Sequence, residues 1–120
     1  MQLLSHTDQL HAADLQLGND ADALSQNLQG VQTIELHFPS FTDGRAFSQA
    51  LMLRRRCGFQ GDIRATGDVL VDQLQQMQRC GFSSALLRAD QSLDKGRELL
   101  SHISAFYQGD VAQPQPLFAR

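Results

Sequence analysis

Side chains able to bind an anion gather where an expected strand passes into an expected helix, in the run FPSFTDGR at residues 38–45. Thr42 or Asp43 can accept hydrogen bonds from the free N–H groups at a helix start, and Gly44 allows close approach to the backbone. Arg45 then falls in the first helical turn, where its charge opposes the helix dipole. Helix N-termini bind anions, and arginine holds oxyanions in a bidentate manner. This junction therefore predicts an anion or substrate site, and helix capping is the alternative.

Later junctions supply further candidates for the same site. Ligands of α/β proteins gather outside the carboxyl ends of the strands, which is where we expect Arg64 and Arg88 as additional anion-binding residues. Asp68 and His37 are the candidates for catalytic proton transfer, because imidazole titrates near neutral pH and a nearby carboxylate can also transfer a proton. Arg45 has the alternative of pairing with Asp43 or Asp68, and His37 that of a structural role. Helix capping alone would also explain the acidic residue found at every junction: Asp20, Asp43, Asp68 and Asp90.

The sequence carries none of the common cofactor or metal motifs. It contains no GxGxxG, Walker, GxSxG or CxxC pattern, and its four histidines are scattered. Cys57 and Cys80 are too few for a disulfide framework or a four-ligand zinc site. We therefore predict no metal site and leave the cofactor unknown.

Short extended runs alternate with longer helical ones, which is typical of βα units. We expect strands at residues 14–17, 33–38, 62–66 and 84–88, and helices at 20–29, 43–57, 68–80 and 92–107. The sequence RCGF occurs at residues 56–59 and again at 79–82, and both copies are interpreted as helix stops in which glycine adopts a left-handed conformation. These elements predict a single α/β domain over residues 1–107, in which 1–13 is an N-terminal extension, followed by an extended tail at 108–120.

The expected strands alternate polar and apolar residues, so helices should cover mainly one face of a parallel sheet. Right-handed crossovers between neighbouring strands give four consecutive βα units, an arrangement similar to half of a (βα)8 barrel. The uncovered face would carry Glu35, His37, Arg64 and Arg88, as a solvent-facing sheet, a polar lumen or a ligand site. A bare face is uncommon in parallel sheets, and we therefore predict a homodimer in which a second copy covers this face or its edge.

Composition narrows the functional classes further. The 120 residues carry a formal charge of −3, which leaves no basic field for nucleic acid. No apolar run is long enough to span a membrane, and residues 1–6 lack the features of a signal peptide. We expect a cytoplasmic protein that binds neither nucleic acid nor membrane.

The runs at residues 38–48, 54–74 and 79–82 resemble the bacterial domain-of-unknown-function family nine-three-four, over roughly residues 14–107. Members of that family are labelled as oxidoreductases of sulfite reduction, because their genes lie beside those of assimilatory sulfate and sulfite reduction. The matching motif positions are Asp43, Gly44, Arg45, Ser48, Arg64, Gly67, Asp68, Asp72 and Gln73.

The resemblance and the residues together predict an accessory protein of assimilatory sulfate and sulfite reduction. In one form it binds an oxyanion through Arg45, Arg64 and Arg88, and the family label implies an oxidoreductase. The alternative is a non-enzymatic interaction module. It would dock on a partner enzyme of sulfur assimilation, namely a reductase of the pathway.

Overall fold

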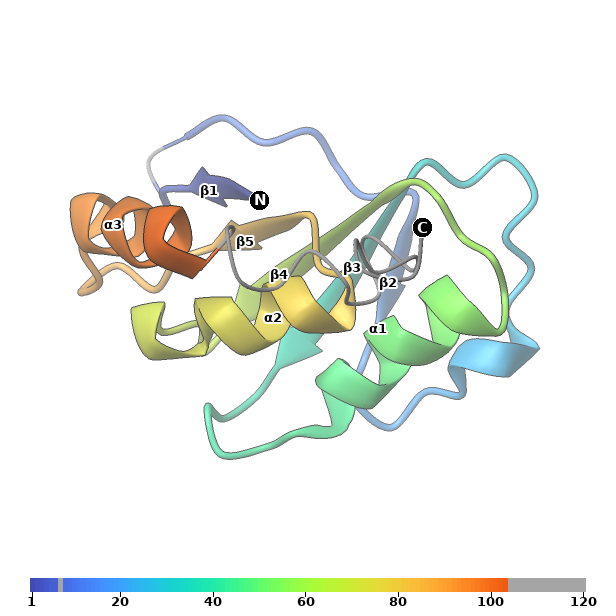
Figure 1. The fold of residues 1–120 in the computed structure, drawn as a ribbon. Helices are drawn as coiled ribbons and strands as arrows, with labels where there is room; N and C mark the ends of the chain where they lie inside the picture. Colours follow the sequence, from blue (N-terminus) through green and yellow to red (C-terminus); the bar gives the residue numbers. More distant parts are fainter. Residues whose placement is uncertain (7, 104–120) are drawn as a thin grey trace, which may run out of the picture.

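Five parallel strands form one sheet in the computed structural model, which describes residues 1–6 and 8–103. In chain order they are β1 (Gln2–Leu4), β2 (Leu15–Leu17), β3 (Thr33–Phe38), β4 (Asp62–Gly67) and β5 (Ser84–Leu86). Their order across the sheet is β1-β5-β4-β3-β2, so β2 to β5 are neighbours in the order of the sequence (Figure 1). The predicted α/β class and the predicted neighbours of these four strands are confirmed.

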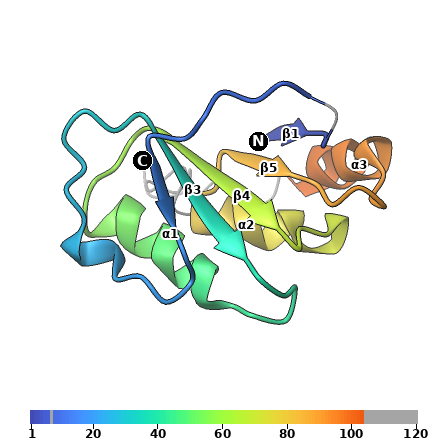
Figure 2. The same cartoon turned by 180° about the vertical axis from the view of Figure 1, so that it is seen from behind.

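The α-helices of the described residues cover one face of this sheet. They are α1 (Arg45–Arg55), α2 (Leu74–Cys80) and α3 (Leu93–Ile103). Seen from behind, β2, β3 and β4 lie in front of α1 and α2 (Figure 2). A Cβ atom added at Gly96 of α3 would lie 2.8 Å from Leu3 Cδ1, so α3 packs closely beside β1. The one-sided helical layer is as predicted, while the likeness to half a barrel stays a prediction.

The hydrophobic core lies between the sheet and these helices. Ile34, Leu36 and Phe38 alternate along β3 and are fully buried. The ring of Phe38 lies 5.1 Å from that of Phe47 in α1, measured between centroids, and 5.7 Å from that of Phe82. Burying rings of this size contributes strongly to stability. This contact fixes the end of β3 against α1 and thereby positions the loop between them.

Both copies of the RCGF sequence end a helix, which confirms their interpretation. Gly81 follows α2 with a φ of 110°, and the N–H of Phe82 donates to the carbonyl of Met77 at 3.0 Å. Gly58 has a φ of 67°, and Phe59 is buried against the core. A residue with a side chain would be strained at these φ values, which is why glycine stands at both positions.

The α-helix expected at residues 20–29 is wrong, since only a 3-10 turn, η1 (Ala23–Ser25), forms there. In an α-helix the carbonyl of Asp22 would accept from the N–H of Gln26. Instead it accepts from the side chains of Ser25 and Gln26, both at 3.0 Å. Such side-chain bonds compete with helical ones, so this polar stretch remains a loop.

The expected N-terminal extension includes a strand of the sheet. Gln2, Leu3 and Leu4 of β1 pair with Ser84, Ala85 and Leu86 of β5. Residues 8–13, called the strap below, then run from the β1 edge past the amino-terminal ends of the strands to the start of β2 (Figure 2). The end of the helix expected at 92–107 and the tail expected at 108–120 lie outside the described residues. No helix within the described ranges has the length and apolar character to span a membrane.

Candidate functional site

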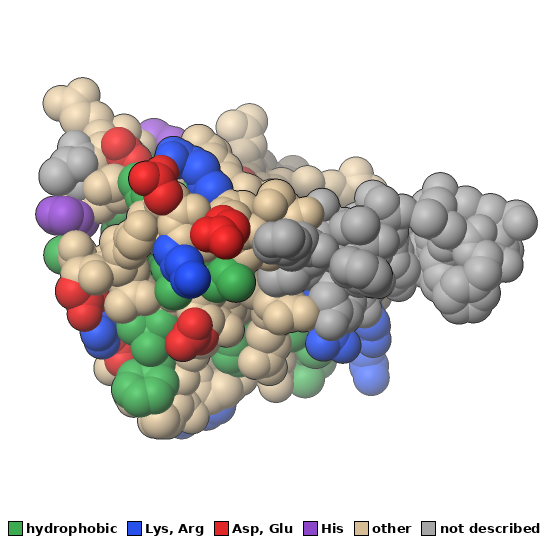
Figure 3. Space-filling view, turned by 60° about the vertical axis from the view of Figure 1, so that its left-hand side comes forward, with side chains coloured by type: hydrophobic (Ala, Val, Ile, Leu, Met, Phe, Trp, Pro, Cys, Tyr) green, Lys and Arg blue, Asp and Glu red, His purple; other side chains and the backbone are tan. Residues whose placement is uncertain are grey.

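The loops that follow the carboxyl ends of the strands gather most of the predicted site residues. We call residues 18–22, 39–44, 68–73 and 87–92 the carboxyl-end rim. Thr42, Asp43 and Gly44 follow β3, and α1 then begins at Arg45. Acidic, basic and apolar side chains lie beside one another on this side of the molecule (Figure 3). The rim therefore brings together charges that the sequence places at separate junctions.

Asp43 binds both the main chain and the side chain of Arg45. Its Oδ1 accepts from the Arg45 backbone N–H at 3.0 Å and from Nε at 3.2 Å, and its Oδ2 accepts from Nη2 at 2.9 Å. The hydrogen bonds from the Arg45 side chain, then that from its backbone, lower the pKa of Asp43 to about 2. The carboxylate of Asp43 thus fills the place that a bound oxyanion would take at this helix start.

Asp43 accepts from the backbone N–H of the first residue of α1, as predicted for a side chain that caps this helix. The N-cap position itself is Gly44, and Thr42 makes no such bond. The hydroxyl of Thr42 instead lies 2.9 Å from that of Ser40. Asn19 of the neighbouring loop donates to Asp43, so the loops after β2 and β3 are joined.

Asp68, the candidate for proton transfer, lies in a second ion-pair cluster. Its Oδ1 accepts from Arg88 Nη1 at 2.6 Å, and its Oδ2 accepts from the backbone N–H of Phe41 at 2.8 Å. The bond from Arg88, followed by that from Phe41, lowers the pKa of Asp68. Arg88 also donates from Nε and Nη2 to the two carboxylate oxygens of Asp90, each at 2.7 Å. Asp68 is held as a carboxylate at neutral pH, a form that suits binding and that can act as a base but not as an acid.

His37 lies on the sheet face away from the helices, opposite Thr66 in the register of β3 and β4. Its imidazole packs on Gly67, where an added Cβ would lie 2.7 Å from His37 Cε1 and 2.3 Å from the Phe38 carbonyl oxygen. The φ of Gly67 is 94°, which also requires glycine. His37 is exposed at the end of β3.

Arg64 is not on the rim, which corrects its expected position. It lies within β4, opposite Glu35 in the register, and is 2% exposed. Its Nη1 donates to Glu35 Oε2 at 3.2 Å and to the carbonyl of His11 at 3.1 Å. The side chain points away from the helical layer, and the strap covers it. The sheet face around Arg64 is therefore not bare. The prediction of a second copy assumed that this whole face was uncovered.

Phe41 is a rim residue that sequence reasoning did not single out. Its N–H donates to Asp68, and its carbonyl accepts from Gln73 Nε2 at 2.6 Å. The residue is nevertheless 49% exposed. The sequence gave no sign that Phe41 is exposed, because its exposure depends on how the loops fold against each other.

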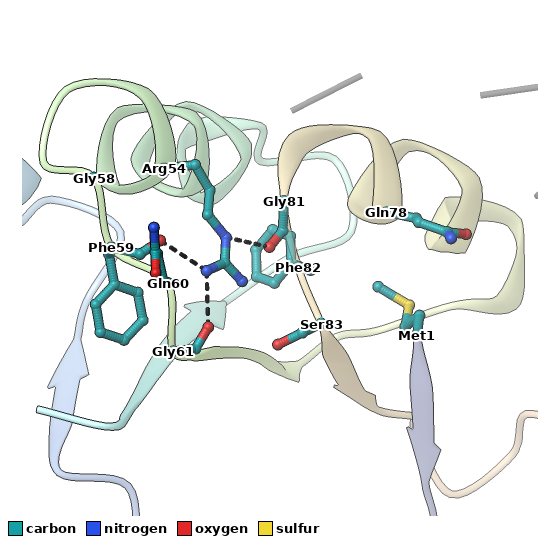
Figure 4. A pocket seen from close by; sticks show the side chains of 10 residues that line it. All are labelled: Met1, Arg54, Gly58, Phe59, Gln60, Gly61, Gln78, Gly81, Phe82 and Ser83. Carbon is teal, nitrogen blue, oxygen red and sulfur yellow. Dashed lines mark hydrogen bonds between the residues drawn. The ribbon is translucent and has the colours of Figure 1, made fainter. Parts of the chain in front are cut away.

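A hollow of about 560 Å³ lies at the opposite end of the strands, beside the two RCGF copies (Figure 4). Arg54 crosses it, with Nε donating to the Gly81 carbonyl at 2.9 Å and Nη1 donating to the carbonyls of Phe59 and Gly61 at 2.9 and 2.8 Å. Burial lowers the pKa of Arg54. The guanidinium thus satisfies two carbonyl groups of the loop between α1 and β4 and the carbonyl of the residue that follows α2, which gives it a structural role. In the part of the chain that the structure describes, no three His, Cys, Asp or Glu side chains are grouped to hold a metal ion.

Comparisons with known proteins place the chain in a family. The comparisons with curated proteins and with solved structures each gave no match. The family described as "Bacterial protein of unknown function (DUF934)" matches residues 12–118, which include every residue of the carboxyl-end rim. Since this match covers most of the 120 residues, the chain belongs to that family of bacterial proteins of unknown function.

Proposed function

We propose that this protein is a non-enzymatic accessory protein of assimilatory sulfate and sulfite reduction, which docks on a reductase of that pathway through its carboxyl-end rim. The pathway comes from the family resemblance in the motifs at residues 38–48 and 54–74. The docking role comes from the geometry of the rim. We further propose that the protein is cytoplasmic, where that pathway operates.

The observation that carries the docking role is the half-exposed ring of Phe41 on a fixed backbone. Hydrogen bonds to Asp68 and from Gln73 hold the N–H and the carbonyl of this residue. A backbone that is already fixed loses little conformational freedom on binding. Aromatic anchors surrounded by polar groups often dominate the energy of protein interfaces, and the rim that carries Phe41 also holds the ion-paired Asp43 and Asp68.

Binding of an oxyanion by Arg45 is the second candidate. The three donors that hold the carboxylate of Asp43 have the geometry to hold sulfate or sulfite. The side chain of Arg45 is also 63% exposed, so a ligand could reach it. An external anion would first have to displace Asp43, which lowers its affinity. We therefore favour docking.

Direct binding to the purified sulfite reductase of the same bacterium tests the docking role. We expect Phe41→Ala to weaken binding by roughly thirtyfold, which corresponds to the loss of an aromatic anchor worth about 2 kcal/mol. Leu24→Ala is the matched control, because Leu24 is an equally exposed apolar residue in η1. Isothermal titration calorimetry of the three proteins measures the dissociation constants.

Two results would overturn the docking proposal. One is that neither the sulfite reductase nor the enzyme that supplies sulfite binds the native protein. The other is that Phe41→Ala and Leu24→Ala weaken binding equally. A strain that lacks the gene adds a cellular measurement: native protein and Leu24→Ala should restore growth on sulfate, and Phe41→Ala should restore it poorly, with all strains growing alike on cysteine.

The homodimer remains a separate proposal, now confined to the part of the sheet face that the strap leaves open. Gln16 and His37 are exposed there on β2 and β3. Light scattering on the purified protein measures the mass, and a value near the 13.3 kDa of one chain at micromolar concentration would contradict a dimer.

A further inference from the structure

The hollow beside the two RCGF copies contains an arginine that still has unused donors. Arginine carries N–H groups on Nε, Nη1 and Nη2 and has no acceptor. In Arg54, Nε donates to the carbonyl of Gly81, and Nη1 donates to those of Phe59 and Gly61. Nη2 has no acceptor within the described residues, and in Figure 4 this nitrogen points into the hollow. The fold therefore leaves one end of the guanidinium available to a ligand.

The positive charge of Arg54 also lacks a direct partner. Its side chain is partly buried, and it forms no ion pair with a carboxylate in the described part of the chain. Asp62 acts on it through space only, and the Asp62 carboxylate is bound instead by the hydroxyls of Ser83 and Ser84. A buried charge is costly unless it is paired. A negatively charged group in the hollow would therefore stabilise this cation.

The other walls of the hollow are neutral. The rings of Phe59 and Phe82 and the side chain of Met1 contribute apolar surface, and Gln60 contributes a neutral amide (Figure 4). Among the described residues that line the hollow, Arg54 has the only charged side chain. The volume of about 560 Å³ lies in the range of small-molecule sites, which are mostly apolar with a few fixed polar groups. An inorganic ion would leave most of this space empty.

The guanidinium of Arg54 is held in place without any ligand. Its hydrogen bonds join the loop before β4 to the residue after α2, and its Cζ lies 5.7 Å from the centroid of the Phe59 ring. A fixed group loses little conformational freedom when it binds an anion. Because Nε and Nη1 already donate to carbonyls, a ligand is held by Nη2 alone and not by the usual pair of nitrogens. Apolar contacts must therefore supply part of the affinity.

We propose that this hollow binds a small organic carboxylate with an apolar body, whose carboxylate pairs with Nη2 of Arg54. The apolar body lies against Phe59 and Phe82. The hollow and the carboxyl-end rim are at opposite ends of the strands, so a ligand in the hollow leaves Phe41 accessible. Binding of the carboxylate is therefore independent of docking through the rim.

Nuclear magnetic resonance titrations of the full chain with acetate, hexanoate, benzoate and neutral benzamide test this site. Acetate offers the charge without a large apolar body, and benzamide offers the ring without the charge. We expect hexanoate and benzoate to shift the backbone amide signals of residues 58–61 and 81–83 saturably. Both should bind at least about tenfold more tightly than acetate or benzamide. The amide signals of rim residues 40–44 should not move.

Gln60→Glu and Gln76→Glu are matched variants for the same titration. Both glutamines are exposed, and Gln60 lines the hollow whereas Gln76 does not. A glutamate at position 60 offers Arg54 an internal carboxylate and repels an anionic ligand, so benzoate should bind at least about tenfold more weakly. Gln76→Glu should bind benzoate as the native protein does. Arg54→Met should also lose binding, but it removes hydrogen bonds of the fold as well, so the glutamine variants are decisive.

Three results would overturn the carboxylate site. The first is that none of the three carboxylates shifts the signals of residues 58–61 and 81–83 saturably. The second is that acetate or benzamide binds as tightly as benzoate, so that either the apolar body or the charge is irrelevant. The third is that Gln60→Glu and Gln76→Glu bind benzoate equally.

Discussion

Arg88 of the rim and Arg45, the first residue of α1, both donate to carboxylates of the chain itself. Arg45 binds Asp43 through its backbone and two side-chain nitrogens, and Arg88 bridges Asp68 and Asp90. Hydrogen bonds between charged groups in this bidentate geometry are the strong ones. The residue types are those of an anion site, but the neighbouring aspartates already occupy it. An external anion would therefore have to displace an aspartate from its arginine before it could bind there.

Replacing Asp43 should convert the start of α1 into a true anion site. In Asp43→Ser, Arg45 and its backbone N–H lose their carboxylate, and sulfate can take its place. We expect sulfate to raise the unfolding temperature of this variant and to leave that of the native protein nearly unchanged, because a ligand that binds only the folded state stabilises it. Differential scanning fluorimetry over a range of sulfate concentrations, at constant ionic strength, measures the effect.

Asp20→Ser is the matched control for this experiment. Asp20 acts on Arg45 through space only, so its removal changes the net charge equally without freeing the donors. Equal responses of the two variants to sulfate would show that net charge, and not the vacated position of Asp43, is responsible.

At the residue scale, sequence reasoning could name partners but could not choose among them. Asp43 and Asp68 were both possible partners of Arg45, since each stands at a strand-to-helix junction. In the structure Arg45 pairs with Asp43, because the loops bring these two side chains together. The path of the loops depends in turn on packing at the end of β3. The contact of His11 with Arg64 joins residues that are 53 positions apart, so no local sequence pattern could predict it.

At the scale of elements, strong periodicity was a reliable guide. Strand β3 lies at the predicted residues 33–38, and β4 extends the predicted strand by one residue. Ala21, Leu24 and Leu28 of the stretch at 20–29 have helical spacing, but side-chain hydrogen bonds to the Asp22 carbonyl compete there with helical ones. Strand β1 is three residues long, too short for alternation to show, and its pairing with β5 is a tertiary effect.

Arg54 joins two βα units, and we expect its loss to destabilise the fold. Arg54→Met keeps the apolar stem but leaves the carbonyls of Phe59, Gly61 and Gly81 without their donors. We expect the free energy of unfolding to fall by about 2–3 kcal/mol, because these partly buried carbonyls lose hydrogen bonds from a charged donor. Urea denaturation at a common m-value measures this loss.

Arg55→Met provides the control, since Arg55 is the next residue of α1 and its side chain is exposed. Its loss should change the free energy of unfolding by less than about 0.5 kcal/mol. If the two variants were equally stable, the carbonyls of Phe59, Gly61 and Gly81 would have found water or other donors, and the joining role of Arg54 would be refuted.

For the whole molecule, the paired aspartates predict how stability depends on acid. The folded-state pKa of Asp43 and that of Asp90 are each about 2, below the ordinary 3.8, because Arg45 and Arg88 respectively bind their charged forms. A group whose pKa falls on folding stabilises the protein above its unfolded pKa. That stabilisation should be lost as pH falls from about 4 to about 2.

Urea denaturation between these pH values checks the acid dependence. The double variant Asp43→Ser/Asp90→Ser should show a flatter decrease in stability over this range than the native protein. A parallel decrease in both proteins would assign the acid dependence to other carboxylates. Added salt should also weaken the native decrease, since both pairs lie in contact with solvent and salt screens exposed charges.

The pairing of β1 with β5 has a consequence for how the chain is made. Gln2 leaves the ribosome long before its partner Ser84. At roughly 5–20 residues per second, the first strand waits about 4–16 s before the strand beside which it belongs exists. This edge of the sheet is therefore closed by a strand that is synthesised before the other four. Nascent protein that has not yet reached β5 must carry Leu3 and Leu4 unsheltered, as a segment open to chaperones.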